Sequence, residues 1–277
     1  MNKVLVGTSG FFFWHWRGRF YPADLKPSRW LDYYWSQGYQ MLEINSTYHQ
    51  MPSRESMKRW RRQCPPGREY VVKMFRGVTH WKGGPLADEG QWRTAVWKFQ
   101  DAVRHLEEKC LVWLHQFPPS FKRTVENAAR LRAYVGHLHG LVPGIAHAFE
   151  FRDPGWYCED TQRELKLYSE ALVQTIGPPG VGDLGAGVIT SMTITYLRFH
   201  GSLGWFTGSY SDARLAAIAE NCRYWADQCG RKVIVAFNND SDPAKLISPA
   251  CEDAKKFQAM VRAKHTEGVL DAVGGTQ

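Results

Sequence analysis

Polar side chains recur in β-rich segments at places where a buried strand is normally apolar. In residues 41–48, "MLEINSTY", Glu43, Asn45 and Thr47 share one face by the two-residue period of a strand. Comparable positions late in other β-rich segments hold Lys73, Gln116, Glu150, Arg152, Arg198, His200, Asn238 and Asp240. This set combines carboxylates that can act as bases, cations that can hold anionic oxygens, and amides and a histidine that can orient or protonate a substrate.

The cost of burying charge limits how these side chains can be interpreted. An uncompensated buried charge is expensive, so charged groups on several strands must converge on one another, on water or on a ligand. A polar mouth that binds a ligand is the favoured interpretation. The alternative is an internal ion-pair network, with Glu43 and Glu150 against Lys73, Arg152 and Arg198, that only closes the fold.

The elements that would position these residues are β-rich runs that alternate with amphipathic segments along the whole chain. This is the pattern of repeated βα units on a parallel sheet. We expect eight strands, in residues 3–9, 40–47, 69–75, 110–117, 145–152, 172–176, 195–201 and 232–240. They predict a single α/β domain over residues 1–265, a (β/α)8 TIM-type barrel with its functional groups at the carboxyl ends of the strands, followed by a frayed tail at 266–277. A doubly wound open sheet is the alternative.

Helix starts are indicated by capping residues between these runs. The expected starts are Ser28, Ser53, a capping box at residues 161–164, Ser211, and Ser248 before Pro249. The Gly/Pro-rich residues 177–187 are expected to form a loop after the sixth strand.

The first βα loop, residues 7–22, is rich in aromatic residues: "GTSGFFFWHWRGRFYP". Its Gly-x-x-Gly spacing is not a nucleotide-cofactor fingerprint, because a phosphate-binding turn should open directly into a helix and here aromatic residues follow. We expect this elaborated loop to pack over the barrel. The alternative is a lid or a stacking surface for sugars or bases.

The composition is that of a globular protein, and its net positive charge favours the binding of anions. The formal charge is +8 and the pI about 9.2, which favours small anionic ligands or nucleic acid as partners. The chain begins without a signal-peptide pattern and has no apolar run that could span a bilayer, so a cytoplasmic protein without membrane contact is expected. Its 6 cysteines form no Cys-x-x-Cys pair. No feature indicates a specific metal or an oligomeric state.

Motifs in the same segments resemble the YecE-like family, known as domain of unknown function 72. In chain order they are "VGTSGF", "WRGRFYP", "LEINSTY", "VTH", "LHQFPPSF", "FEFRDPGWY", "LRFHGS" and "AFNND". The resemblance covers nearly the full length and implies a TIM-type barrel in a family without an established reaction. It implies polar site positions at Glu43, Asn45, Lys73, His80, Gln116, Glu150, Arg152, Arg198, His200, Asn238 and Asn239. Trp156, in "FEFRDPGWY", is a further candidate for substrate binding.

This chain departs from the family pattern around the expected site. Tyr48-His49 stands where the family usually has an aromatic pair, and Gly155 replaces a frequent serine before Trp156. The segment after Asp240 also differs from the usual Gly/Ala-rich continuation. These departures concern the rim and the substrate preference more than the inner site.

Three functions follow from these features. The leading hypothesis is an enzyme, of hydrolase type, acting on a phosphate ester or a nucleic-acid component. Lys73, Arg152 and Arg198 would hold the anion, Glu43 or Glu150 would be the base, and His200 the acid or a divalent-metal ligand. The second is a glycoside hydrolase using Glu43 and Glu150. The third is a non-catalytic binder of nucleic acid or protein, suggested by the basic residues 54–62 and the aromatic loop.

Overall fold

The structure is a computed structural model that describes residues 3–177, 183–239 and 249–263. Its strands form one sheet in the order β6-β5-β4-β3-β2-β1-β9-β8-β7, and every ladder is parallel. The strands are β1 Val4–Ser9, β2 Met41–Ile44, β3 Glu69–Lys73, β4 Cys110–Phe117, β5 Ala146–Phe151, β6 Ala171–Leu172, β7 Gln174–Ile176, β8 Ile194–Phe199 and β9 Lys232–Phe237. The predicted parallel barrel is confirmed, and the open doubly wound sheet was wrong.

The sixth predicted strand is divided at Val173 into β6 and β7. Residues of β6 pair with β5, as in Phe149 opposite Leu172, whereas the strand that β7 pairs with is β8, as in Thr175 opposite Arg198. The Val173 amide donates to the Phe149 carbonyl at 2.9 Å, so the first half of the segment remains attached to β5. The barrel is therefore closed by a strand that changes partner halfway along its length.

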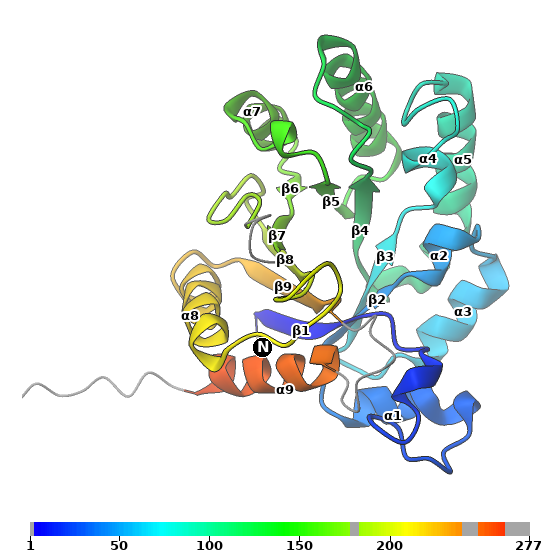
Figure 1. Ribbon diagram of the computed structural model, residues 1–277. Coiled ribbons are helices and arrows are strands. Elements are labelled where there is room, and N and C mark those ends of the chain that lie inside the picture. The colour runs from blue at the N-terminus through cyan, green and yellow to red at the C-terminus, as the bar shows by residue number, and fades with distance from the viewer. Residues whose placement is uncertain (1–2, 178–182, 240–248, 264–277) are drawn as a thin grey trace, which may run out of the picture.

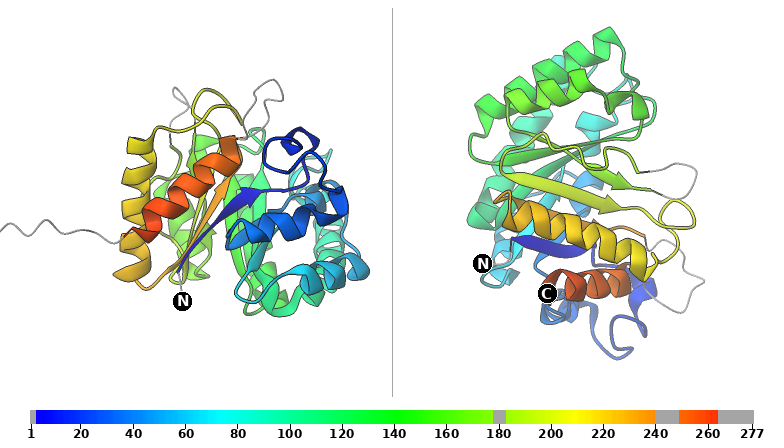
Figure 2. Two further views of the ribbon diagram at one scale, coloured as in Figure 1. Left: turned by 90° about the horizontal axis from the view of Figure 1, so that it is seen from below. Right: turned by 90° about the vertical axis from the view of Figure 1, so that its left-hand side faces the viewer.

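Helices surround the strands in a ring (Figure 1) and lie along the outside of the barrel in the side views (Figure 2). In the described residues they are α1 Trp30–Ser36, α2 Ser46–His49, α3 Arg54–Gln63, α4 Arg76–Thr79, α5 Glu89–Val103, α6 Val125–Leu141, α7 Glu159–Leu167, α8 Asp212–Asp227 and α9 Pro249–Arg262. The described residues between β7 and β8 contain no helix. The sixth βα unit thus lacks its outer helix there, in agreement with the expected loop.

Capping explains where several helices begin. Ser53 accepts from the Ser56 amide, with a reciprocal capping-box bond, and Ser211 accepts from the Arg214 amide. Both predicted starts are confirmed. Two others were wrong: α1 follows a short 3-10 turn over Pro27–Arg29, and α7 begins at Glu159, before the expected capping box. Pro249 is the first residue of α9, while Ser248 lies outside the described residues.

Strand β2 is shorter than predicted, because the chain turns into α2 directly after Asn45. Thr47 therefore lies in a helix instead of on the strand face, and its hydroxyl donates to the Lys73 carbonyl at 2.6 Å. This bond fixes the segment after β2 against the end of β3.

The core has an inner and an outer part. The outer part lies between the strands and the helices, and the inner part fills the barrel. The inner apolar residues are Leu5, Met41, Val71, Val112, Leu114, Ala148, Ala171, Val173, Ile194, Tyr196, Ile234 and Ala236. By the two-residue period, inward positions nearer the carboxyl ends hold Ser9, Glu43, Lys73, Gln116, Glu150 and Arg198. The polar residues therefore form a layer inside the barrel above an apolar one.

The aromatic first loop was predicted to pack over the barrel, and its rings pack on α1. Trp16, Tyr21 and Trp30 are buried, and the rings of Tyr21 and Trp30 stack with their centroids 4.6 Å apart. Phe12 and Trp14 keep 51% and 60% of their surface exposed. The loop thus both covers α1 and presents aromatic rings to solvent.

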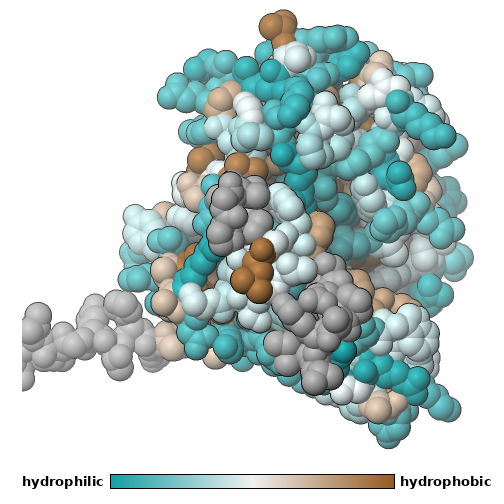
Figure 3. Space-filling view, in the orientation of Figure 1, coloured by the Kyte–Doolittle hydropathy of each residue, from teal (hydrophilic) through white to brown (hydrophobic). Residues whose placement is uncertain are grey.

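The face of the molecule seen in Figure 1 is mostly hydrophilic, with hydrophobic side chains in small separate areas (Figure 3). Among the described helices, none combines the length and the hydrophobicity needed to cross a membrane.

Candidate active site at the barrel mouth

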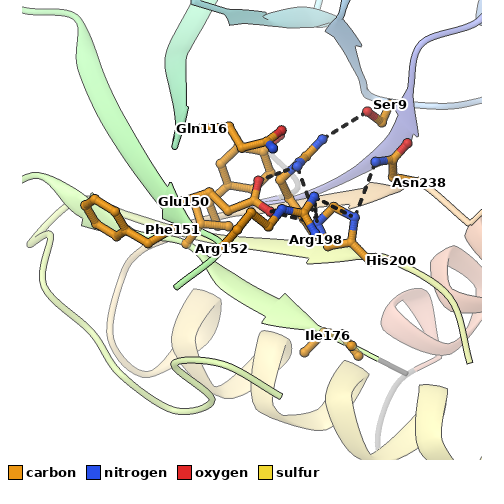
Figure 4. A network of polar contacts seen from close by, with 12 residues as sticks. Ser9, Gln116, Glu150, Phe151, Arg152, Ile176, Arg198, His200 and Asn238 are labelled. Atoms are coloured by element: carbon orange, nitrogen blue, oxygen red, sulfur yellow. Dashed lines mark hydrogen bonds and ion pairs between the residues drawn. The ribbon is translucent and has the colours of Figure 1, made fainter. Parts of the chain in front are cut away.

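The guanidinium of Arg198 lies at the centre of the polar layer. Its Nε donates to Oε2 of Glu43 at 2.9 Å and its Nη2 to Oε1 of Glu43 at 2.7 Å, while Nη1 contacts Oε2 of Glu150. All three side chains have no exposed surface. Figure 4 shows Glu150, Arg198 and His200 turned toward one another, whereas Phe151 and Ile176 point away from the cluster. One cation from β8 thus joins acids from β2 and β5.

Glu43 has further donors around it. The hydroxyls of Ser9 and Tyr196 both donate to its carboxylate, and Asn45 Nδ2 donates to Ser9 Oγ at 2.6 Å. Ser9 pairs with Glu43 in the β1–β2 register, which explains why the two side chains meet. The Glu43 carboxylate is therefore fully occupied by protein donors from two strands, β1 and β8.

Glu150 contacts His200 and Arg152 as well as Arg198. Its Oε1 lies 2.9 Å from His200 Nε2 and 3.1 Å from Arg152 Nε. Burial lowers the pKa of His200 to about 3, against the opposing effect of Glu150. His200 is therefore neutral near pH 7, and its Nε2 faces Glu150.

Electrostatics keep both acids ionised. Burial alone would raise the pKa of the Glu43 carboxyl, but Arg198 beside it holds that pKa below its usual range. The same balance applies to Glu150, where Arg152 and Arg198 outweigh burial and hold the pKa well below the ordinary value. Neither carboxyl is protonated at neutral pH, and both are already paired with Arg198.

Lys73 differs from the other cations of the cluster. Its Nζ donates to Gln116 Oε1 at 2.6 Å and lies 4.4 Å from the centre of the Tyr48 ring. In the described residues, no carboxylate lies within ion-pair distance of this nitrogen. Burial, followed by the positive charge of Arg198, lowers the pKa of Lys73 to about 7, although Glu43 and Glu150 act in the opposite direction.

Arg152 lies at the edge of the cluster, with 9% of its side chain exposed. Its guanidinium carbon is 4.4 Å from the centre of the Trp205 ring and Nη2 lies 3.3 Å from His200 Nε2. Asn238 Nδ2 lies 3.3 Å from His200 Nδ1. Arg152 and Asn238 thus contact the same histidine from β5 and from the end of β9.

His80 stands beside Lys73 at the rim. Its ring lies 5.2 Å from the Tyr48 ring, and its Nδ1 is 2.9 Å from Thr79 Oγ1. Burial and the neighbouring Lys73 charge lower the pKa of His80 to about 4. Like His200, it is neutral at pH 7.

Two predicted site residues in the described chain do not join the cluster, and a third cannot be placed. Asn239 is fully buried and donates to Asp253 Oδ2 at 2.8 Å and to the Gly208 carbonyl at 2.9 Å, so it ties a loop to α9. Trp156 is buried outside the barrel, where its ring stacks on Phe151 and its Nε1 donates to the Phe121 carbonyl. Asp240 lies outside the described residues.

Several contact residues were missed by the sequence prediction. Ser9 and Tyr196 bind Glu43, Trp205 stacks on Arg152, and Arg76 lies near Tyr48 with its guanidinium carbon 5.9 Å from the ring centre. The two-residue period could have identified Tyr196, because it shares a face with Arg198 and His200. Trp205 lies in a loop and Arg76 is the first residue of the short helix α4, so no strand period marks either of them.

An apolar cavity of about 440 Å³ adjoins the cluster. Its walls are Phe11, Phe12, Phe13, His49 and Trp60, and Glu43 and Asn45 contribute at one side. The aromatic loop therefore lines a cavity that reaches the polar layer.

Metal ligands do not gather in the described residues: no group of at least 3 His, Cys, Asp or Glu side chains has a suitable arrangement there. His200 has one carboxylate partner, Glu150, whose other oxygen is held by Arg198. The carboxylate beside His200 is therefore already paired with a guanidinium, and it is not available as a metal ligand without breaking that pair.

Comparison with known proteins shows the family to which the chain is related. A family model described as "Protein of unknown function DUF72" matches residues 5–273. No curated protein matches the chain.

Solved structures give the same result. A DUF72 family protein from Thermotoga maritima shares 30% identity at a TM-score of 0.79, covering 94% of this chain and 99% of that one. One from Enterococcus faecalis shares 20% identity at a TM-score of 0.75, covering 95% and 96%. A D-psicose 3-epimerase, solved in the presence of D-fructose, has 11% identity and a TM-score of 0.53 over 86% of this chain and 93% of that one. This last likeness concerns the barrel fold alone.

Proposed function

This chain belongs to the DUF72 family of proteins of unknown function, and from that premise we propose that it is an enzyme acting on a small anionic substrate at the carboxyl-terminal mouth of the barrel. The substrate class is a phosphate ester or a nucleic-acid component. The observation that carries the proposal is Lys73, a buried amine at a strand end with an amide partner in place of a carboxylate. Perturbed titratable groups of this kind cluster at functional sites.

The charges of the cluster favour an anion. Glu43 and Glu150 balance Arg198 and Arg152, so protonation of Lys73 leaves one positive charge without a counter-ion. An anion bound there would stabilise the ammonium and raise its pKa. Lys73 and Arg152, which keep some exposed surface, are the cations that would meet it, and the buried Arg198 would position the two acids.

The roles assigned from the sequence change accordingly. Lys73, with a pKa of about 7, is better suited than Glu43 or Glu150 to gain and lose a proton near neutral pH. His200 would orient Arg152 and Glu150 as a neutral ring instead of acting as an acid. Gln116 and Asn238 would hold Lys73 and His200 in place.

The glycoside hydrolase hypothesis has less support. A retaining or inverting pair needs a cleft between its two acids and one acid with a raised pKa. Here the Arg198 guanidinium lies between Glu43 and Glu150, and the pKa of each acid is lowered.

The nucleic-acid binding hypothesis is weakened by the ion pairs of α3. Arg54 pairs with Asp101 at 2.7 Å and Arg61 with Glu107 at 2.7 Å, while Lys58 pairs with Glu55 at 3.0 Å within the helix. The helix also lies in the outer ring (Figure 1), away from the polar layer. Much of the charge that suggested a nucleic-acid surface is thus neutralised.

Calorimetric titration with inorganic phosphate and with a nucleoside monophosphate tests the proposal. We expect binding that weakens as pH rises through about 7, where Lys73 loses its proton. Lys73→Met and Arg152→Met should each weaken it by tenfold or more. Lys98→Met, which removes the same charge from an exposed position on α5, should not. Equal affinity in all three variants would overturn the proposal.

A further inference from the structure

Lys73 has the surroundings of a nucleophile as well as those of a cation. It is the last residue of β3, at the carboxyl end where the barrel opens, and 9% of its surface is exposed. Its one hydrogen-bond acceptor in the described residues is the Gln116 amide oxygen, 2.6 Å from Nζ. An uncharged amine can also donate a hydrogen to this oxygen, and its lone pair is then left free.

Two other features show that Lys73 is not the cation of an ion pair with Glu43 or Glu150. Arg198 is held by Glu43 and Glu150, so both acids have a guanidinium nearer than Lys73. The positive charges of Arg198 and Arg152 both lower the pKa of Lys73. Burial next to other cations is a known way for a protein to keep a lysine unprotonated and reactive toward carbonyl compounds.

We propose that Lys73 forms a covalent imine with a small carbonyl compound that carries an anionic group, an inference that rests on the proposed function and names its substrate class more closely. The substrate would be an aldehyde or ketone bearing a phosphate or carboxylate. Arg152 would hold the anionic group, and the Lys73 nitrogen would meet the carbonyl carbon.

The covalent step balances without a redox partner. The lone pair of the neutral amine attacks the carbonyl carbon, and the electron pair of the C=O bond moves to oxygen. Proton transfer from nitrogen to oxygen gives a carbinolamine, which expels water as the C=N bond forms. Protonation of the imine nitrogen gives a cation that withdraws electrons from the neighbouring carbon, and hydrolysis by water returns the amine.

The charges around Lys73 would stabilise the protonated imine. The carboxylates of Glu43 and Glu150 stabilise positive charge at Lys73, as the direction of their effect on its pKa shows. They would act in the same way on a protonated imine, which carries its charge at the same nitrogen. The Tyr48 ring, 4.4 Å from Nζ, would face this cation.

Reductive trapping tests the inference. The full-length protein is incubated at pH 7 with glyoxylate, a small anionic aldehyde, in the presence of cyanoborohydride, and the modified residue is located by peptide mass spectrometry. We expect Lys73 to be labelled about tenfold faster than exposed lysines such as Lys98, because the lowered pKa of Lys73 leaves a large fraction of its amine unprotonated at pH 7. Inorganic phosphate should slow this labelling by competing for the same cations.

Variants and a second probe separate the alternatives. Lys73→Arg keeps the charge and should lose the labelling, whereas Lys98→Met should keep it. Labelling of Lys73 no faster than that of Lys98 overturns the imine. If phosphate still binds in that case, the proposed anion-binding function is supported without the imine. If phosphate does not bind either, the proposed function and the imine are both overturned. Equal labelling by glyoxylate and by uncharged acetaldehyde overturns the requirement for an anionic group.

Discussion

Arg198 holds Glu43 through two hydrogen bonds, of 2.9 Å and 2.7 Å, one to each carboxylate oxygen, between side chains that have no exposed surface. The same guanidinium contacts Glu150 through its third nitrogen. A ligand site and an internal ion-pair network were alternatives for these residues. The contacts show that the network exists, and they leave Lys73 and Arg152 at its edge as the cations that a ligand could reach.

Replacing Arg198 should strongly destabilise the fold. Arg198→Met leaves the buried Glu43 without its guanidinium partner and Glu150 with Arg152 alone, and breaking a buried pair costs about 3–5 kcal/mol. The free energy of unfolding in urea at pH 7 measures the loss. Arg132→Met removes an arginine that is 62% exposed and pairs with Glu164 on the surface, so it should change stability little.

The loss caused by Arg198→Met should depend on pH. In the native protein the pKa values of Glu43 and Glu150 lie below their ordinary values, so their pairing contributes stability above about pH 4.5 that is lost on further acidification. Without Arg198 the Glu43 carboxyl loses the charge that mainly holds its pKa down and can be protonated on acidification to pH 4, so the difference between variant and native protein should shrink there. The same difference at pH 4 and pH 7 would mean that packing, and not charge, causes the loss.

Removing Lys73 should stabilise the protein. Its pKa of about 7 lies below the usual 10.5, so the folded state binds fewer protons than the unfolded state between these values, and native stability rises with pH across this window. At pH 6 the full cost of the buried ammonium is present, and Lys73→Met should gain about 1–2 kcal/mol. Urea unfolding at pH 6 and pH 9 should show the gain shrinking at the higher pH. A loss of stability at pH 6 would contradict the expected cost.

Glu170 should make stability fall as pH rises toward 7. Burial raises the pKa of this carboxyl to about 7 from an ordinary 4.5, so the folded state binds more protons in this window and stability decreases across it. Its Oε2 accepts from the His147 amide at 2.8 Å, a bond that Glu170→Gln can keep. The variant should therefore have a higher Tm than the native protein at pH 8 and an equal one at pH 4. An exposed control on α8, Glu220→Gln, should show no such difference between the two pH values.

Substitutions of the adjacent residues Asn238 and Asn239 should have different effects, one on ligand binding and the other on stability. Asn239 donates to Asp253 and to the Gly208 carbonyl, so Asn239→Ala should lower the free energy of unfolding by about 1–3 kcal/mol and leave the Kd for phosphate unchanged. Asn238 contacts His200 in the cluster, so Asn238→Ala should change the Kd more than the stability. The reverse pattern would move Asn239 into the binding site.

Much of the barrel could be predicted because its strands are short, apolar and regularly spaced. Cys110–Phe117 was predicted with its observed bounds. The division at Val173 could not be foreseen, because a change of hydrogen-bonding partner leaves no mark on which residues are apolar. At α7, the Ser/Thr-x-x-Glu pattern at Thr161 was misleading, since the helix starts earlier at Glu159 and Thr161 already lies inside it.

The candidate site was also predicted only in part. The two-residue period identified the inward polar residues, including Glu43, Glu150 and Arg198, because it depends only on local geometry. Which cation meets which acid depends on closure of the barrel, since Arg198 and Glu43 are 155 residues apart in the chain. The distinct state of Lys73 also follows from that pairing, because Arg198 occupies both acids.

The divided sixth strand has a consequence for the geometry of the mouth. Neighbouring strands can in principle slide past each other by breaking and re-forming a ladder, but β6 and β7 are joined through the single residue Val173. The ladder of β5 and the ladder of β8 are thus coupled by peptide bonds, which do not slip. Glu150 is on β5 and Arg198 is on β8, so the covalent chain itself fixes how far these two side chains can shift along the barrel axis.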